Sequence, residues 1–212
     1  MGLFRKTFPV GPLGCNCSLL ADEDTKEALV IDPGDEFEHI WSLIQENELQ
    51  VKAIIHTHAH IDHIGATAEL AAATKAKTYL HPEDIFLHQI LAEQAQMIGL
   101  PAPTSSPIDE DLVDEASFRF GEHELGVLHT PGHTPGSVCF CLQKSDLCFS
   151  GDTLFSGSIG RTDLWGGDFE LIQKSIKDRL YTLNGSVEVI PGHGPNTHID
   201  VERHSNAFVR AD

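Results

Sequence analysis

Histidine and aspartate are concentrated in one short part of the chain. Residues 56–65 read His-Thr-His-Ala-His-Ile-Asp-His-Ile-Gly. Imidazole and carboxylate groups are ligands of Zn²⁺ and similar first-row metals. In extended backbone alternate side chains point to the same side, so His58 and His60 would face one ion. Asp62 and His63 would begin the following helix and point in different directions, so they could serve a second ion. The segment therefore predicts a metal site.

The spacing of these histidines leaves one alternative set of metal ligands. His56 also alternates with His58 and His60, so a ligand triple of these three histidines fits the spacing as well. Only His58 and His60 keep the spacing His-x-His-x-Asp-His. We therefore interpret His56 as a neighbour at the end of a strand.

Three further segments also place a histidine or an aspartate in a turn that contains glycine. His133 lies in the string TPGHTPG, Asp152 in SGDT and His193 in PGHGP, and each string follows an apolar run. Loops held by a rigid sheet are where functional sites collect. Each string alone is a weak signal, because such turns occur by chance. Together with the first cluster they predict one ligand set: His58, His60, Asp62, His63, His133, Asp152 and His193.

Five imidazoles and two carboxylates are more than one tetrahedral ion can use. The natural partition is two ions with one carboxylate between them. Two metals ~3.5–4 Å apart can share a hydroxide, because metal binding lowers the pKa of water towards ~7. We therefore expect two divalent metal ions per chain and a hydrolytic reaction that needs no serine or cysteine nucleophile. Zinc is the expected metal, and iron and manganese accept the same donors.

The elements that would position these residues alternate between strands and helices. A Pro/Ser/Asp-rich loop at 101–114 would join two half-domains of one domain over residues 1–212, a length that α/β folds often use as one unit. Each half mixes both element types, which favours two sheets with helices outside. The expected strands are 27–32, 51–55, 77–80, 117–120, 124–129, 137–142, 147–150 and 187–190, and the expected helices 37–50, 66–74, from Pro82 to about Gly99, and 169–183.

Composition excludes several classes of function. The 32 acidic against 14 basic residues give a net charge of −18, which repels nucleic-acid phosphates, so we expect no nucleic-acid partner. No apolar run approaches the ~18 residues of a membrane span, and residues 1–10 do not resemble a secretory signal. We expect a cytoplasmic protein without a membrane partner. Its five cysteines are then expected to be free, buried thiols.

The strings THAHIDH, TPGHTPG, GDT and PGHG, in this order, resemble the metallo-β-lactamase superfamily. The longer strings TPGHTPG and GDTLF are similar to the glyoxalase II group, the hydroxyacylglutathione hydrolases, in a short form without that group's C-terminal helical extension. The resemblance implies an α/β fold, an αββα four-layer sandwich with two mixed β-sheets flanked by helices. It also implies a ligand partition: His58, His60 and His133 on one ion, Asp62, His63 and His193 on the other, and Asp152 bridging.

The same resemblance implies hydrolysis of a small-molecule thioester, S-D-lactoylglutathione or a related hydroxyacyl thioester, by a hydroxide between the metals. A thiolate leaves readily, since thiol pKa values lie near ~8.5. Asp62 could orient the hydroxide. Arg161, in the string GSIGRTD, is the local cation for an anionic substrate tail, and a structural contact with Asp163 is the alternative.

Other functions remain as hypotheses on the same fold, because the fold does not set the substrate. One is a persulfide dioxygenase with a single iron on His58, His133 and Asp152. Others are a lactonase, a β-lactamase or a phosphodiesterase on the same scaffold. The last is a metal-storing protein without turnover. The sequence leaves the oligomeric state open.

Overall fold

The chain divides into two compact units. The structure is a computed structural model that describes residues 2–105, 107–142 and 144–211. Unit 1 runs to Leu112 and takes up Arg119–His123, and unit 2 comprises Val113–Phe118 and the chain from Glu124. The boundary at Leu112 lies in the 101–114 segment that was expected to join two half-domains. A single domain over residues 1–212 stays a prediction.

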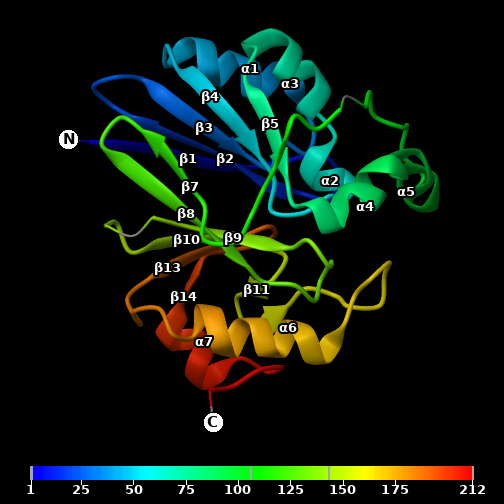
Figure 1. Cartoon of the computed structure of the whole chain (residues 1–212), viewed down its shortest axis with the longest axis vertical. Helices are drawn as coiled ribbons and strands as arrows, with labels where there is room; N and C mark the ends of the chain where they lie inside the picture. The colour runs from blue at the N-terminus through cyan, green and yellow to red at the C-terminus, as the bar shows by residue number, and fades with distance from the viewer. Residues whose placement is uncertain (1, 106, 143, 212) are drawn as a thin grey trace. The chain divides into compact units, whose positions relative to one another are not determined.

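Unit 1 contains a mixed six-stranded sheet (Figure 1). β1, β2 and β3 are antiparallel, whereas β3, β4, β5 and β6 run parallel. The strands expected at 27–32, 51–55 and 77–80 are confirmed. β1 and β2 were not expected, because polar and apolar residues do not alternate cleanly along either strand. The strands in spatial order are β1 Leu3–Val10, β2 Cys15–Asp22, β3 Glu27–Ile31, β4 Gln50–Ile55, β5 Lys77–Leu80 and β6 Glu110–Asp111.

The helices of unit 1 are short and cover the sheet with their apolar residues. Ile40 and Ile44 of α1 and Leu70 of α3 pack on Val30 and Ile54 of the sheet. The predicted helix 37–50 ends early, at Glu46, since residue 50 already begins β4. The helical elements are α1 Phe37–Glu46, α2 Ile61–Ile64, α3 Thr67–Thr74, η1 Pro82–Asp84, α4 Ile85–Gln89 and α5 Leu91–Ile98.

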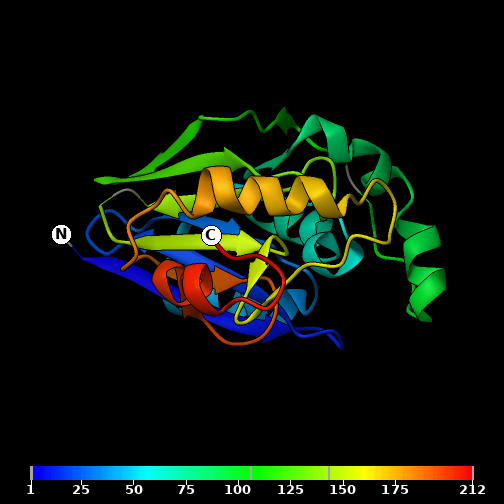
Figure 2. The ribbon, with the colours of Figure 1, turned by 90° about the horizontal axis from the view of Figure 1, so that it is seen from below.

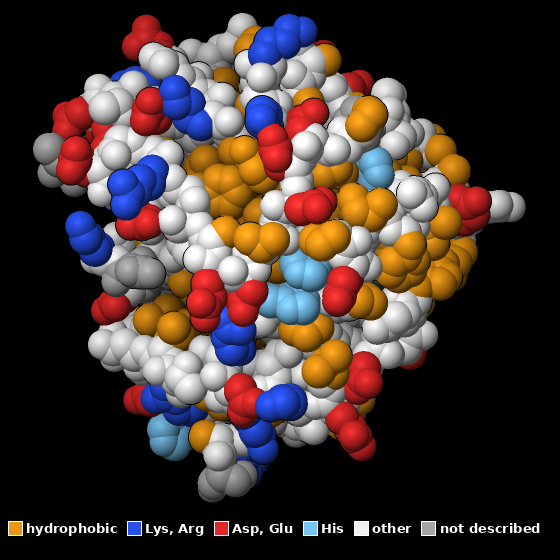
Figure 3. Space-filling view, viewed as in Figure 1, with side chains coloured by type: hydrophobic (Ala, Val, Ile, Leu, Met, Phe, Trp, Pro, Cys, Tyr) orange, Lys and Arg blue, Asp and Glu red, His pale blue; other side chains and the backbone are white. Residues whose placement is uncertain are grey.

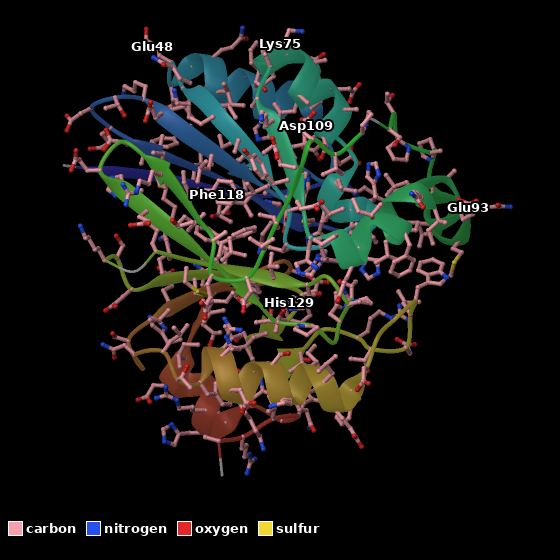
Figure 4. The ribbon with its side chains drawn as sticks, viewed as in Figure 1. Glu48, Lys75, Glu93, Asp109, Phe118 and His129 are labelled. Carbon is pink, nitrogen blue, oxygen red and sulfur yellow. A yellow bond between two sulfur atoms is a disulfide. The ribbon has the colours of Figure 1, made fainter. Side chains whose placement is uncertain are left out.

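The region from Pro82 to Gly99 is helical as expected but broken at Ile90. Gly99 ends it with a left-handed φ of 71°, which favours glycine. Exposed apolar side chains gather over α4 and α5, including Phe86, Met97 and Ile98 (Figure 3). Glu93 points to solvent from the same region (Figure 4).

The second six-stranded sheet is also mixed, since β10 pairs in parallel with β13, whereas the pairs β10–β9, β9–β8 and β13–β14 are antiparallel. The expected strands of this half are confirmed to within two residues at each end. The short strands β11, β12 and β14 were not expected, because strands of two residues carry no periodicity. The seven-residue helix α7 was not expected either. In spatial order the strands are β14 Thr197–His198, β13 Glu188–Pro191, β10 Leu147–Gly151, β9 Val138–Leu142, β8 His123–His129 and β7 Ser117–Phe120, with a separate hairpin of β11 Leu154–Phe155 and β12 Ser158–Ile159.

Helices α6 Phe169–Ser175 and α7 Ile199–Ser205 cover one face of the unit 2 sheet (Figures 1 and 2). α6 continues into a π-helical turn, η2 Ile176–Leu180, so the helix expected at 169–183 ends at Leu180. Ile172 and Ile199 pack with Cys139 and Val189 of the sheet. An α/β fold with two mixed sheets flanked by helices is thus confirmed. No helix in the described part of the chain is long and apolar enough to cross a bilayer.

The expectation of five free thiols is wrong at two positions. Cys141 on β9 lies directly opposite Cys148 on β10, and the two form a disulfide. The sequence could not show this register, because it depends on how two strands pair. Cys15, Cys17 and Cys139 are free and buried as expected, and burial raises the pKa of the Cys139 thiol to about 11.

Counting thiols in denatured protein tests this pairing. Without a reductant we expect three reactive thiols per chain, from Cys15, Cys17 and Cys139, and after reduction all five cysteines should react. In the control variant Cys141→Ser the four remaining thiols should react without reduction. Five reactive thiols in the unreduced, air-handled wild-type protein would contradict the disulfide.

Candidate metal centre

The unit 1 ligand candidates follow β4, whose parallel neighbour β3 ends at the same edge of the sheet. Asp32 comes directly after β3, and residues 56–63 follow β4, so both segments start at the same edge of the sheet. The ring centres of His58 and His60 lie 4.8 Å apart, and those of His58 and His63 lie 4.0 Å apart. Nε2 of His63 lies 3.8 Å from Oδ2 of Asp62. Within unit 1 the structure therefore brings all four predicted ligands together.

Asp32 fixes the orientation of two of these histidines. Its buried carboxylate accepts hydrogen bonds from the Thr57 amide (2.7 Å), the Thr57 hydroxyl (2.6 Å) and Nδ1 of His63 (3.0 Å). Because the Thr57 hydroxyl gives its proton to Asp32, its oxygen accepts from Nδ1 of His58 at 3.1 Å. Both histidines thus carry a proton on Nδ1 and present Nε2 to a cation.

The sequence analysis assigned Asp32 no role. The available signal was a carboxylate at a strand end, followed by Pro33-Gly34, at the same sheet edge as the histidine cluster.

The segment after β3 passes very close to the backbone of Asp62, which explains the glycine at position 34. A Cβ on residue 34 would lie 1.5 Å from the backbone oxygen of Asp62. Only glycine allows the two segments to meet here.

Two buried side chains from the helices hold the backbone between the ligands. Gln94 of α5 accepts a hydrogen bond from the Ile61 amide (2.9 Å) and donates to the carbonyls of Ala59 (3.1 Å) and Leu87 (2.9 Å). Asp84 accepts from the Ala59 amide at 3.1 Å. The sequence analysis missed both residues, because a glutamine inside a helix carries no local signature of such a contact.

The surroundings of His56 agree with its interpretation as a strand-end neighbour. Nδ1 donates to the Tyr79 carbonyl at 2.8 Å, and Nε2 accepts from the Thr67 hydroxyl at 2.8 Å. Burial lowers the pKa of this imidazole to about 4, so it is neutral at pH 7. Both nitrogens are used within the protein, which leaves neither for a metal.

The unit 2 candidates are gathered around Asp152. The parallel strands β10 and β13 end at the same edge, where Asp152 and His193 follow them. Oδ2 of Asp152 lies 3.6 Å from Nε2 of His133 and 3.7 Å from Nε2 of His193. One carboxylate oxygen therefore faces two imidazole nitrogens.

His133 is oriented by the loop that follows β12. Its Nδ1 donates to the backbone carbonyl of Arg161 at 2.7 Å, which directs Nε2 towards Asp152. The contact depends on Gly160. A Cβ at residue 160 would lie 1.8 Å from the Asp152 carbonyl oxygen and 3.0 Å from Nδ1 of His133.

Gly160→Ala is therefore expected to displace this loop from His133. The added methyl cannot be accommodated against backbone, so we expect a metal affinity lower by about 10-fold, the lower end for lost ligand support. Metal titration followed by mass spectrometry of bound metal measures it. Ser156→Ala, an exposed change on the preceding turn, is the control and should bind metal like the wild type. An unchanged affinity in Gly160→Ala would contradict the role of this contact.

Arg161 is engaged with Asp163, which was the structural alternative. Its guanidinium donates two hydrogen bonds to the Asp163 carboxylate, at 2.7 and 2.9 Å. The hydrogen bond from Arg161 lowers the pKa of Asp163 to about 2. Both side chains are exposed, so this pair shapes the loop that supports His133.

The donor spacings within each unit fit a metal. In three imidazole–carboxylate pairs, the nitrogen and the oxygen that would bind a metal lie 3.6, 3.7 and 3.8 Å apart. These distances are longer than a normal hydrogen bond. Two ligands of one tetrahedral ion with bonds of ~2.0–2.2 Å lie about 3.3–3.6 Å apart. The donors are also the types that Zn²⁺ and Fe²⁺ accept. Both ligand sets are therefore suited to divalent metals.

Comparison with known proteins agrees with this chemistry. Residues 10–193 match the model of the metallo-beta-lactamase superfamily. The chain is 40% identical to the hydroxyacylglutathione hydrolase GloC of Haemophilus influenzae, over 96% of each protein. The crystal structure of BLEG-1, a B3 metallo-beta-lactamase, is 39% identical, with a TM-score of 0.90 over 97% of this chain and 99% of that one.

A third relative bears on the metal. The protein TTHA1623, solved in a di-iron-bound form, is 39% identical with a TM-score of 0.88, over 96% of this chain and 100% of that one. The fold of these relatives binds divalent metals. The match to the family model covers most of the sequence, and the relatives are matched over nearly their whole length. This chain therefore belongs to the metallo-β-lactamase superfamily.

Proposed function

We propose that the chain is a binuclear metallohydrolase that cleaves thioesters. The observation that carries the proposal is the single oxygen of Asp152 that faces Nε2 of both His133 and His193, a position from which one oxygen could bridge two ions. We assign one ion to His58, His60 and His133, the other to Asp62, His63 and His193, and the bridge to Asp152.

Bound divalent ions would lower the pKa of a shared water to near ~7 and polarise a carbonyl oxygen. The chain's own residues hold that chemistry in place. Asp32 keeps Nε2 of His58 and His63 turned to the ions, and the Arg161 carbonyl does the same for His133. In this proposal Asp62 also orients the water by accepting its proton.

The proposed substrate is a hydroxyacyl thioester such as S-D-lactoylglutathione. Its support is the 40% identity to GloC and the ease with which a thiolate leaves without a strong general acid. The guanidinium of Arg161 would meet an anionic tail by exchanging the Asp163 carboxylate for a substrate carboxylate. A small-molecule partner and a cytoplasmic location belong to the same proposal.

The test combines metal analysis with a thioester assay. Protein purified without chelator or added metal should hold about two ions per chain, as a two-metal site requires, and should hydrolyse S-D-lactoylglutathione. Removal of the metal should abolish turnover, and zinc, iron or manganese should restore it. One iron per chain with oxygen uptake on glutathione persulfide would instead support a dioxygenase. Two ions per chain without thioester hydrolysis would overturn the proposed substrate.

β-Lactam hydrolysis is the second candidate, and the specific observation in its favour is the likeness to BLEG-1. The same centre could attack a lactam carbonyl. However, an amine is a poorer leaving group than a thiolate and needs a proton donor. A chromogenic cephalosporin assayed beside the thioester decides between the two by their kcat/KM values.

Asp62→Asn tests the proposed orienting role. The amide keeps an oxygen for the metal but cannot take a proton, so we expect kcat to fall by about 100-fold, within the usual range for a lost general base. The metal content of each preparation is measured together with kcat. The control is Asp24→Asn, a substitution at an exposed position. Unchanged turnover with metal content intact would reject the role.

A further inference from the structure

A pocket of about 280 Å³ lies within unit 1 beside Asp62. Its walls are the turn at 11–13 between β1 and β2, the segment 100–104 after α5, and residues of α2 and α3. Asp62, the proposed metal ligand, forms part of the wall. A group bound here would therefore lie next to the reacting carbonyl.

Much of the lining is apolar. Leu13 at the tip of the β1–β2 turn is 49% exposed, a large apolar side chain that faces water at the pocket. Ile61 of α2, Ala66 at the start of α3 and Leu100 after α5 contribute apolar surface. Contact with such a lining favours an aliphatic group, since burial of apolar surface stabilises the bound state.

The charged groups of the lining are all acidic. Asp35, Asp62 and Glu69 contribute carboxylates, and no lysine or arginine is among the described residues that line the pocket. Asp62 is engaged with a metal in the proposed centre, so Asp35 and Glu69 are the charges that a bound group meets. Glu69 projects from the first turn of α3 and is exposed. A negatively charged group would be repelled here.

We propose that this pocket binds the acyl part of the substrate and selects short, uncharged acyl groups over acyl groups that carry a carboxylate. The inference rests on the proposed thioester hydrolysis and names its acyl specificity. A volume of about 280 Å³ is at the lower end of ligand pockets, which span ~300–1,000 Å³ for drug-sized ligands, so a short chain fits. The anionic thiol part of a glutathione thioester then lies outside the pocket.

The first experiment compares two acyl groups of similar length on one uncharged thiol. Hexanoyl- and glutaryl-N-acetylcysteamine share the same first four carbons and then differ by a terminal ethyl group against a terminal carboxylate. On the metal-loaded protein we expect kcat/KM to favour the hexanoyl compound by about 10-fold or more, because like charges a few Å apart repel appreciably even at the dielectric of water. Equal rates, or a preference for glutaryl, would overturn the proposal.

Charge variants assign the selectivity to the pocket. Glu69→Lys should lower the hexanoyl-to-glutaryl ratio several-fold, and Glu69→Gln should lower it by less. Glu38→Lys is the matched control, because it changes the net charge equally from an exposed site on α1 outside the pocket. If Glu38→Lys lowers the ratio as much as Glu69→Lys, the selectivity comes from the overall charge, and the pocket has no such role.

A binding measurement separates this inference from the proposed function. Hexanamide and hexanoate are titrated into ¹⁵N-labelled, metal-free protein, and the amide signals of Leu13, Gly65 and Ala66 are followed. Hexanamide should shift these signals at lower concentration than hexanoate does, and Glu69→Lys should reduce the difference. If no thioester is hydrolysed but this difference is seen, the proposed function fails and the pocket's preference stands. If thioesters are hydrolysed but neither probe shifts these signals, the acyl pocket is excluded.

Discussion

Asp32→Asn is expected to weaken metal binding by about 10- to 100-fold, as changes to groups that orient ligands do, while the chain still folds. The asparagine keeps the size of the side chain and one acceptor oxygen for the Thr57 amide. Its NH₂ group faces Nδ1 of His63, where the carboxylate now accepts a proton at 3.0 Å. Two donors cannot share that contact. His63 would therefore move its proton to Nε2, the nitrogen that the metal needs.

The same substitution disturbs His58 through Thr57. The Thr57 hydroxyl donates to Asp32 at 2.6 Å and accepts from His58 at 3.1 Å, so the loss of one acceptor changes both contacts. One residue directly after β3 thus sets the tautomers of two ligands. Metal titration at constant pH, with bound metal measured by mass spectrometry, tests the expectation.

Asp32→Ala separates positioning from stability. Removal of the buried carboxylate leaves the Thr57 amide and Nδ1 of His63 without their acceptor, and a buried donor left without a partner costs about 1–3 kcal/mol of folding stability. Denaturant unfolding of metal-free protein should show this loss in Asp32→Ala and a smaller one in Asp32→Asn. Asp24→Asn, exposed on the turn after β2, should match the wild type in both assays. Full metal affinity in Asp32→Asn would show that the carboxylate does not set the tautomers.

The ligand residues could be predicted because their signal is local. A histidine or aspartate between a strand end and a Gly/Pro turn is visible in a single string, and four such strings were found in order. The supporting residues could not be predicted, because their role depends on distant pairing. Gln94 reaches the ligand loop from α5, 33 residues beyond the amide of Ile61 that it binds. Its own neighbours in the sequence give no sign of that contact.

In the fold, too, elements with a local signal were predicted, and features that depend on strand pairing were missed. Strands with several apolar residues close together, such as β4 and β10, were expected at the correct place. β1 was missed, although it pairs with β2 along its whole length, from Leu3 to Val10. Its mixed pattern of charged and apolar residues is acceptable because β1 is an edge strand, where charged residues are common, and its Arg5 and Lys6 are exposed. The register that sets Cys141 opposite Cys148 is likewise a property of the pairing and not of either strand alone.

Asp152→Asn is expected to have the largest effect on activity, a loss beyond the ~10–100-fold typical of groups that only support ligands. The asparagine retains the shape of the side chain but removes its negative charge. Oδ2 of Asp152 lies between the Nε2 atoms of His133 and His193, and both imidazoles are neutral when they bind a metal. In unit 2 the carboxylate is therefore the one predicted ligand that offsets the charge of the ions.

Metal stoichiometry distinguishes this role from a structural one. The wild type should hold about two ions per chain, and Asp152→Asn about one or fewer, since a two-metal site depends on its bridging ligand. The unfolding midpoint of the metal-free protein should change little, because the side chain is at the site's surface, 12% exposed, and is not part of the apolar core of unit 2. Glu170→Gln, an exposed change in the first turn of α6, removes the same charge from unit 2 as a control. If Asp152→Asn holds two ions and turns over normally, the carboxylate does not bridge, and the binuclear assignment fails with it.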